Sequence, residues 1–121
     1  MDERERLIRD YFSSWLHRDA SCLPAVFSED AIYIESHGPR YEGLSQIRQW
    51  FAEWLPHGEV LEWRIVRFLH QGDQTAVEWV FRCRYDGVES VFDGVSLIRF
   101  NSEGKIAHLR EFQARCQPTI I

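Results

Sequence analysis

The chain has 121 residues, 45% of them hydrophobic and 14% aromatic, and a formal net charge of −5. This length fits one domain, 1–121, and the hydrophobic fraction indicates a packed core and excludes a disordered chain. An acidic chain with no basic run argues against nucleic-acid binding, and no apolar stretch approaches the roughly 18–20 residues that cross a bilayer. The charged N-terminus lacks the apolar core of a signal peptide, so we expect a soluble cytoplasmic protein.

The first half of the chain predicts three helices and one strand. Apolar residues at helical spacing predict an amphipathic helix over about 2–18 and a short helix that starts near Leu23. The run AIYIES (31–36) has the composition of a strand, and the stretch 37–43, with its glycines and proline, indicates a loop. A third helix is predicted over about 44–55, where a proline and a glycine then stop the pattern.

The second half changes to a period of two residues, which indicates β-strands. Apolar and polar residues alternate around 61–65 and over 77–85, and the turn sequence QGDQ joins the two predicted strands. The dipeptide Asp86-Gly87 is a strong hairpin signal. Two further strands are predicted over 88–100 and about 105–116. Helices grouped early and strands grouped late predict an α+β domain, in which the helices cover one face of a four-strand antiparallel meander.

The sheet face that points away from the helices also carries apolar side chains. Val80, Val88, Val91 and Ala107 fall on it, mixed with charged residues. A half-apolar outer face is typical of a surface that a partner covers. We therefore expect a homodimer that forms through the outer sheet face.

A series of landmarks runs in a fixed order along nearly the whole chain. They are the first helix (11–19), FSEDA (27–31), Gly43 with Ile47, FDG (92–94), and Phe100 followed by GKI (104–106). In this order the chain resembles the nuclear transport factor 2-like superfamily, which includes the SnoaL-like cyclases and ketosteroid isomerase. The resemblance implies a cone-shaped fold: a curved antiparallel sheet, about three N-terminal helices packed over its concave face, and a pocket between them.

The resemblance to ketosteroid isomerase implies roles for three positions. The isomerase tyrosine that donates to the oxyanion falls on Tyr11, and its aspartate base falls on Glu35. Its second oxyanion donor, a protonated aspartate, falls on Ser96, and a serine is a weaker donor than a buried carboxylic acid. This departure argues against steroid isomerisation as the specific reaction, and the superfamily also contains cyclases, dehydratases and non-catalytic binding domains.

Glu35 and His37 are the candidate bases. An apolar pocket raises the pKa of a carboxylate by desolvation, which brings Glu35 towards the range useful for proton abstraction at neutral pH. The alternation of the strand also permits the opposite placement, with Ile32 and Ile34 inward and Glu35 in solvent. Because the histidine side chain can exchange a proton at physiological pH, His37 is a base or donor in one interpretation, and a loop histidine in the other.

Tyr11 and Glu111 are the candidate donors or acids. Tyr11 lies on the buried stripe of the first helix, where it is either a core residue or a side chain whose hydroxyl reaches the pocket. The resemblance places one face of the last strand inward, with Leu109, Glu111 and Gln113 on it. An inward Glu111 is costly unless it is protonated or paired with an arginine, and both alternatives stay open.

These residues lead to two hypotheses for function. In the first, the chain is a cofactor-free isomerase, cyclase or dehydratase that moves a proton on a small apolar or polycyclic carbonyl substrate. In the second, it is a non-catalytic ligand-binding or dimerisation domain. In the first hypothesis the substrate pocket is lined by Trp15, Phe27, Trp50, Trp54, Trp79, Phe81, Ser96, Leu109 and Gln113.

The sequence predicts no metal site and no cofactor. The five histidines are scattered without the spacing of metal ligands. Cys22, Cys83 and Cys116 form no CxxC pair, so we expect them to be free and mostly buried thiols.

Overall fold

The structure is a computed structural model that describes residues 2–114, which form three helices and a six-stranded sheet. The helices are α1 (Glu3–His17), α2 (Leu23–Val26) and α3 (Leu44–Trp54). The strands are β1 (Phe27–Ile34), β2 (Arg40–Glu42), β3 (Gly58–Gln71), β4 (Gln74–Tyr85), β5 (Val88–Phe100) and β6 (Ile106–Gln113). Their order across the sheet is β2-β1-β6-β5-β4-β3.

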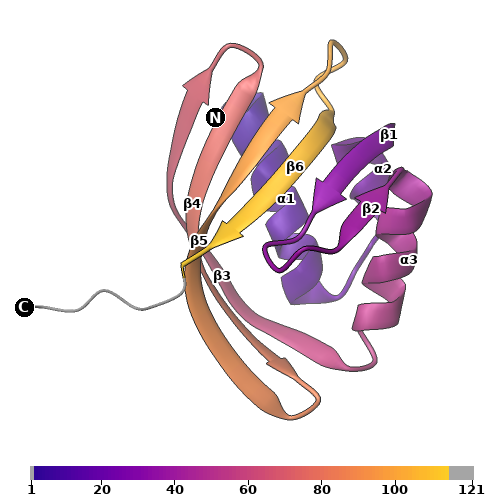
Figure 1. The fold of residues 1–121 in the computed structure, drawn as a ribbon. Coiled ribbons are helices and arrows are strands. Elements are labelled where there is room, and N and C mark those ends of the chain that lie inside the picture. The colour runs from indigo at the N-terminus through magenta and orange to yellow at the C-terminus, as the bar shows by residue number, and fades with distance from the viewer. Residues whose placement is uncertain (1, 115–121) are drawn as a thin grey trace, which may run out of the picture.

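The sheet is strongly curved, and the helices pack on its concave side (Figure 1). Helix α1 lies inside the curve and contacts β3, while α3 lies against β1 and β2 at the other edge. Each helix buries its apolar stripe against the sheet, as expected for a fold built of two layers. The predicted α+β cone with three helices over the concave face is confirmed.

Local signals explain where α1 begins and ends. The Asp2 side chain caps its N-terminus by accepting hydrogen bonds from the backbone N–H groups of Arg4 and Glu5. Arg18 ends the helix in the left-handed conformation, with a φ of 58°. The buried residues of the helix recur at helical spacing and are Ile8, Tyr11, Phe12, Ser14 and Trp15.

The sheet is larger than the sequence pattern predicted. Strands β3 to β6 form the expected antiparallel meander. The stretch expected to be a loop contains β2, which pairs antiparallel with β1 and places Tyr33 beside Tyr41. Strand β1 runs parallel to β6, with Tyr33 beside Leu109, so the sheet is mixed. This parallel pair brings the residues that follow β1 next to the end of β6, where the candidate site lies.

Two of the three cysteines lie in the part of the chain that the structure describes. Cys22 and Cys83 are free thiols, and Cys83 is buried. Cys116 and the predicted end of the last strand lie outside the described residues. Within residues 2–114, no helix has both the length and the apolar composition needed to cross a bilayer.

Candidate functional site

A cavity of about 580 Å³ opens between helices α1 and α3 and the concave face of the sheet. Its volume falls in the range of about 300–1,000 Å³ that is usual for small-molecule sites. The side chains that line it are Trp15, Tyr33, Glu35, Ser36, His37, Pro39, Tyr41, Trp50, Glu53, Trp54, Val60, Trp63, Trp79, Phe81, Cys83, Tyr85, Ser90, Phe92, Glu111 and Gln113.

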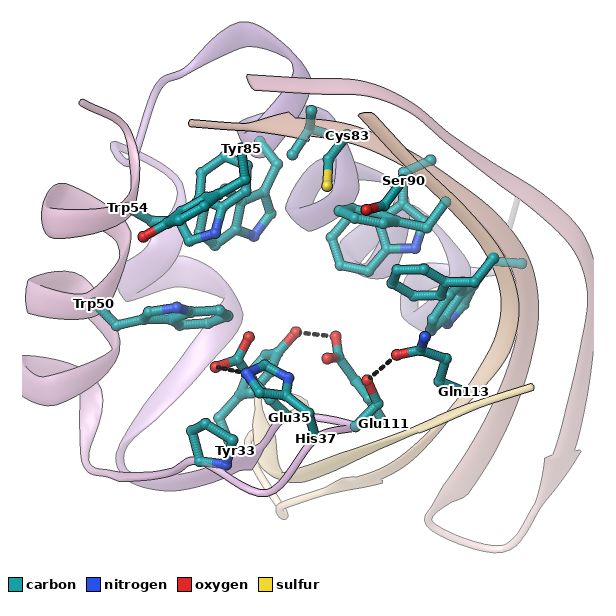
Figure 2. A pocket seen from close by; sticks show the side chains of 18 of the residues that line it. Tyr33, Glu35, His37, Trp50, Trp54, Cys83, Tyr85, Ser90, Glu111 and Gln113 are labelled. Carbon is teal, nitrogen blue, oxygen red and sulfur yellow. Dashed lines mark hydrogen bonds and ion pairs between the residues drawn. The ribbon is translucent and has the colours of Figure 1, made fainter. Parts of the chain in front are cut away.

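Half of the residues that line the cavity are Trp, Tyr or Phe, and all five tryptophans of the chain are among them. The Trp15 ring packs against Trp50 and Trp54, with centroids 5.0 and 5.3 Å away. Trp50 also stacks on Tyr41 at a centroid distance of 4.6 Å and an interplanar angle of 12°. Figure 2 shows Trp50 and Trp54 on one side of an open space and the acidic residues on another side. The tryptophans therefore border the cavity and do not fill it.

A chain of hydrogen bonds leads from α1 to the carboxyl group of Glu111. The indole N–H of Trp15 donates to the Tyr11 hydroxyl over 3.0 Å. The Tyr11 hydroxyl donates to the Tyr33 hydroxyl over 2.7 Å, and Tyr33 donates to Oε2 of Glu111 over 2.5 Å. Burial, together with the negative charge of Glu111, raises the pKa of both tyrosines well above 10.0, so both remain neutral donors.

Glu111 is held in an environment that favours its protonated form. Removal from bulk water raises the pKa of this carboxyl from 4.5 to about 8, and repulsion from nearby Glu35 adds to the increase. The hydrogen bond from Tyr33 acts in the opposite direction but does not outweigh burial. The side chain lines the cavity and has no arginine partner among the described residues. Of the two alternatives for Glu111, protonation is the one that this environment favours.

Glu35 faces the same cavity from the segment after β1. Its side chain is only 15% exposed, and burial raises the pKa of its carboxyl. Tyr41 donates a hydrogen bond to its Oε2 over 2.7 Å, which partly opposes that increase. His37 lies at the cavity mouth with its side chain 66% exposed, and its Nε2 is 3.9 Å from the same oxygen. The strand alternation therefore turns Tyr33 and Glu35 inward, and the opposite placement with Glu35 in solvent is not found.

The structure brings together most of the residues expected at the site. Nine of them line the cavity: Trp15, Glu35, His37, Trp50, Trp54, Trp79, Phe81, Glu111 and Gln113.

Four other expected residues lie in the core behind the cavity wall. Tyr11 is buried behind Tyr33, and Phe27 packs edge-on against Tyr11 at 5.0 Å. Ser96 is fully buried and accepts a hydrogen bond from the indole N–H of Trp79 over 2.9 Å. Leu109 is fully buried and packs in the hydrophobic core. These four residues support the site from behind, since none of them borders the cavity.

Tyr33 is the most important site residue that sequence reasoning missed. It donates directly to Glu111, a position nearer to the cavity than that of Tyr11. Its signal was present in the sequence, because Tyr33 and Glu35 are two residues apart and share one face of an extended chain. Tyr41, Glu53, Trp63 and Phe92 were missed as lining residues too.

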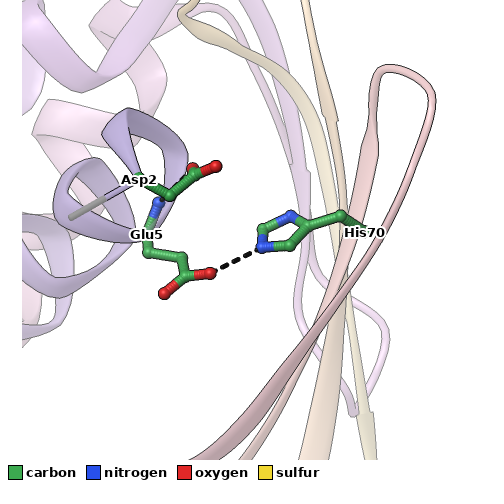
Figure 3. A group of neighbouring side chains, drawn as sticks. All are labelled: Asp2, Glu5 and His70. Carbon is green, nitrogen blue, oxygen red and sulfur yellow. Dashed lines mark hydrogen bonds and ion pairs between the residues drawn. The ribbon is translucent and has the colours of Figure 1, made fainter.

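A second group of titratable side chains lies far from this cavity, where α1 meets the hairpin of β3 and β4. Asp2, Glu5 and His70 each place a ligand atom within 4.8 Å of the others (Figure 3). Each side chain already has a structural partner. Asp2 caps α1, His70 Nε2 lies 2.7 Å from Oε2 of Glu5, and His70 Nδ1 lies 2.8 Å from Oγ1 of Thr75.

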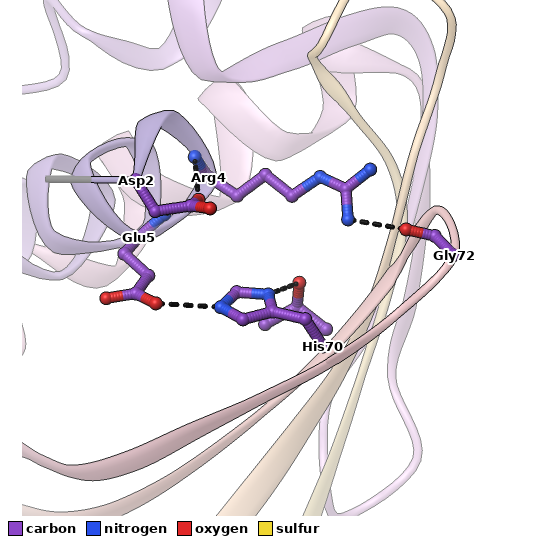
Figure 4. Close-up of polar contacts among 6 residues, drawn as sticks. Asp2, Arg4, Glu5, His70 and Gly72 are labelled. Carbon is purple, nitrogen blue, oxygen red and sulfur yellow. Dashed lines mark hydrogen bonds and ion pairs between the residues drawn. The ribbon is translucent and has the colours of Figure 1, made fainter.

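The same contacts fix the tip of that hairpin to the start of α1 (Figure 4). Arg4 adds a hydrogen bond from its guanidinium to the carbonyl oxygen of Gly72 over 2.6 Å. The group is therefore accounted for as a clamp between two elements, and we do not assign a metal to it.

Comparison with known proteins places the chain among folds of this kind. A model of the SnoaL-like domain matches residues 8–109. A protein from Catenulispora acidiphila with a ketosteroid isomerase-like fold, solved in complex with trimethylamine, is 18% identical with a TM-score of 0.79, and the match covers 90% of this chain and 85% of that one. No curated protein matches the sequence.

Two further solved structures are similar in fold. An LEH-like epoxide hydrolase from M. tuberculosis is 15% identical with a TM-score of 0.82, over 93% of this chain and 83% of that one. A candidate SnoaL-like polyketide cyclase from Mesorhizobium loti is 23% identical with a TM-score of 0.71, over 89% of this chain and 97% of that one. The cone, its cavity and the match over residues 8–109 lead to one conclusion: the chain belongs to the SnoaL-like domain family.

Proposed function

We propose that this cavity binds a small apolar or polycyclic molecule and catalyses proton transfer next to a carbonyl group without a cofactor, as an isomerase, cyclase or dehydratase does. The observation that carries the proposal is a pair of carboxyl groups, Glu35 and Glu111, that border one aromatic cavity and both have raised pKa values. Two carboxyls that border one cavity provide a base and an acid in the same site.

The geometry supports a role for each group. Glu35, which faces the cavity and accepts a hydrogen bond from Tyr41, removes the proton from the carbon next to the substrate carbonyl. Glu111 is neutral at pH 7 and donates a hydrogen bond to the carbonyl oxygen as that oxygen becomes negative. Tyr33 holds Glu111 in place through its own hydrogen bond. Return of the proton from Glu35 to another carbon completes an isomerisation and leaves the protein unchanged.

His37 is an alternative base. Its ring lies near Glu35 at the mouth of the cavity. Its high exposure leaves it more strongly hydrated than Glu35, which makes it the weaker candidate for a reaction inside the cavity.

A second candidate function is ligand binding without chemistry. The observation in its favour is the wall, in which aromatic side chains outnumber the groups that can transfer a proton. Binding requires only the shaped space. The similar protein from Catenulispora acidiphila, solved with trimethylamine, is consistent with a scaffold that accommodates small molecules.

Hydrogen–deuterium exchange at carbon distinguishes the two functions. The protein is incubated in deuterated buffer with a panel of enolisable aryl and polycyclic ketones, and deuterium incorporation is followed by NMR. If the proposal is correct, at least one ketone exchanges faster than in buffer alone, and the Glu35→Gln variant loses this activity by roughly 100-fold because the base is gone. Glu53→Gln is the matched control, since Glu53 borders the same cavity but has no role in the proposed reaction.

Two outcomes contradict catalysis. One is exchange no faster than in buffer for every ketone that binds, and the other is equal loss of activity in Glu35→Gln and Glu53→Gln. Binding of a ketone without exchange leaves the binding function in place.

We also propose a homodimer through the outer sheet face. Of the residues expected there, Val91 is exposed, and Val80 and Ala107 are half-buried. The prediction is wrong for Val88, which shares the strand face of Ser90 and Phe92 and so lies on the cavity side of the sheet. Leu97 and Phe112 are larger, are 46% and 43% exposed, and lie on the neighbouring strands β5 and β6. Val80, Val91, Leu97 and Phe112 give the outer face the apolar side chains that a second copy would cover.

Sedimentation velocity at micromolar concentration tests the dimer. The wild type is expected to sediment as a dimer and Leu97→Asp as a monomer, because the new charge would be buried in the interface. Leu16→Asp is the control, since Leu16 is an exposed leucine on α1, away from the outer face. A monomeric wild type, or a dimer that Leu97→Asp leaves intact, contradicts this interface. The expected cytoplasmic location stays a prediction.

A further inference from the structure

The polar part of the cavity wall is acidic. Glu35, Glu53 and Glu111 border the cavity, and no lysine or arginine of the described residues does. His37 is the basic side chain of the lining, and it is mostly exposed at the mouth. A carboxylate or phosphate on a ligand would therefore lie beside acidic groups without a cation to offset its own charge, which is costly in a site removed from water.

The aromatic part of the wall offers ring faces that suit a positive charge. The face of an aromatic ring carries negative electrostatic potential and attracts organic cations, most strongly when the ring is an indole. The cavity is bordered by five tryptophans, three tyrosines and two phenylalanines. Trp50 and its stacking partner Tyr41 are only partly buried, and in Figure 2 Trp50 extends towards the open space, on the side nearest to Glu35.

We propose that the ligand of this cavity is an organic cation: a protonated amine or a quaternary ammonium group carried on an apolar body. The cationic group lies between the indole face of Trp50 and the carboxyls of Glu35 and Glu111, and the apolar body lies against the remaining aromatic side chains. A cavity of about 580 Å³ is larger than a bare ammonium group needs and leaves room for a ring system. This inference rests on the binding part of the proposed function and names its ligand class.

Binding of an organic cation changes the protonation of the carboxyls in the cavity. The titratable groups that line the cavity are Tyr33, Glu35, His37, Tyr41, Glu53, Cys83, Tyr85 and Glu111. A cation beside the two inner carboxyls favours their charged forms, so binding below about pH 8 releases a proton from Glu111. Affinity for a ligand of fixed charge is therefore expected to increase as the pH rises from 6 to 8.

Three probes with one apolar body test the ligand class by calorimetry at pH 7: phenylbutylamine, phenylbutanol and phenylbutyrate. The amine is expected to bind about tenfold more tightly than the alcohol, and the butyrate most weakly. The proposal is overturned if the amine does not bind, or if the alcohol or the butyrate binds as tightly as the amine. Benzyltrimethylammonium, whose charge does not titrate, then serves for the pH series, and binding that weakens from pH 6 to 8 contradicts the carboxyl contact.

Variants distinguish recognition of the positive charge from recognition of the apolar body. The double variant Glu35→Gln, Glu111→Gln is expected to lose the preference for amine over alcohol and to keep its affinity for the alcohol, which also shows that it is folded. Trp50→Leu is expected to weaken the amine more than the alcohol, since the cation loses an aromatic face. Glu103→Gln, at an exposed turn, is the charge control and is expected to bind all three probes as the wild type does.

The outcomes also separate this inference from the proposed chemistry. Amine preference without exchange of any ketone proton leaves the ligand class in place and removes catalysis. Exchange on neutral ketones without amine preference leaves catalysis in place and removes the ligand class.

Discussion

Replacing Glu111 by glutamine is expected to lower the rate of ketone proton exchange by about 100-fold at pH 7, the effect of losing a positioned acid. Glutamine keeps the size of the side chain and still accepts the hydrogen bond from Tyr33, but it is a weaker donor to an oxyanion than a neutral carboxylic acid. The measurement is the initial rate of deuterium incorporation with a ketone that the wild type exchanges. A variant that keeps its full rate would show that Glu111 has no part in the reaction.

The pH profile of the wild type checks the same assignment. Because the pKa of Glu111 is raised to about 8, the acid is present at pH 7 and is lost as the pH increases through 8. The rate is therefore expected to fall above about pH 8. Tyr33→Phe removes the hydrogen bond that lowers the pKa of Glu111. It is therefore expected to raise that pKa further and to move the fall in rate to higher pH. A rate that is constant between pH 7 and 9.5 contradicts the acid role.

Protein stability reports the protonation of Glu111 without reference to activity. Its pKa is about 8 in the folded state and near 4.5 when unfolded, so between these values the folded state binds more protons. The free energy of unfolding then decreases as the pH rises from 4.5 to 8, by on the order of 2 kcal/mol once partial exposure of the side chain is allowed for. Glu111→Gln is expected to remove this decrease. Equal pH dependence in wild type and variant, measured by urea denaturation, contradicts the raised pKa.

The sequence predicted the long strands and helices well, because their signals are local. The hairpin at Asp86-Gly87 and the alternation over 77–85 give β4 and its partner without reference to the rest of the chain. Strand β2 was missed, since three residues after a proline carry no periodic signal and become a strand only by pairing with β1. The parallel contact of β1 with β6 joins residues about 75 positions apart, and no local pattern specifies it.

The sequence predicted which residues belong to the candidate site better than it predicted how those residues are arranged. Glu35 and Glu111 were both named, and both border the cavity. The resemblance assigned the oxyanion donor to Tyr11, whereas in the structure Tyr11 is buried and Tyr33 lies between it and Glu111. Tyr11 lies on a helix and Tyr33 on a strand. Which of the two hydroxyls lies next to Glu111 depends on how α1 packs on the sheet, and no local sequence pattern specifies that packing.

Irregular strand geometry explains another omission. Val60 and Trp63 both border the cavity. Strict alternation would place them on opposite faces of the strand, because their positions differ by three. The register of β3 against β4 shifts between Val60 and Glu62, as expected for a β-bulge. A bulge changes which side chains face inward, and nothing in the residues around it marks its position in this chain.

The wall opposite α1 depends on a glycine, and its replacement is expected to have the largest effect on stability. Gly94 on β5 lies directly beside Trp79 on β4. A Cβ atom at this position would come closer than 3.0 Å to the carbonyl oxygen of Phe112 and to the indole ring of Trp79. The oxygen belongs to the backbone of the neighbouring strand and cannot move cheaply. We expect Gly94→Ala to destabilise the protein by about 3 kcal/mol and to lower Tm by roughly 10 °C.

Ser96→Ala is the matched comparison, because Ser96 lies two residues along the same strand and is fully buried beside the same tryptophan. It removes the hydrogen bond to the Trp79 indole without adding atoms, at an expected cost of about 1 kcal/mol. Denaturation curves of the two variants therefore separate steric exclusion from loss of a hydrogen bond. If Gly94→Ala is no less stable than Ser96→Ala, the tryptophan does not lie against the glycine. If it is much less stable, the absence of a side chain at Gly94 is what lets the indole ring of Trp79 lie against β5 and form part of the cavity wall.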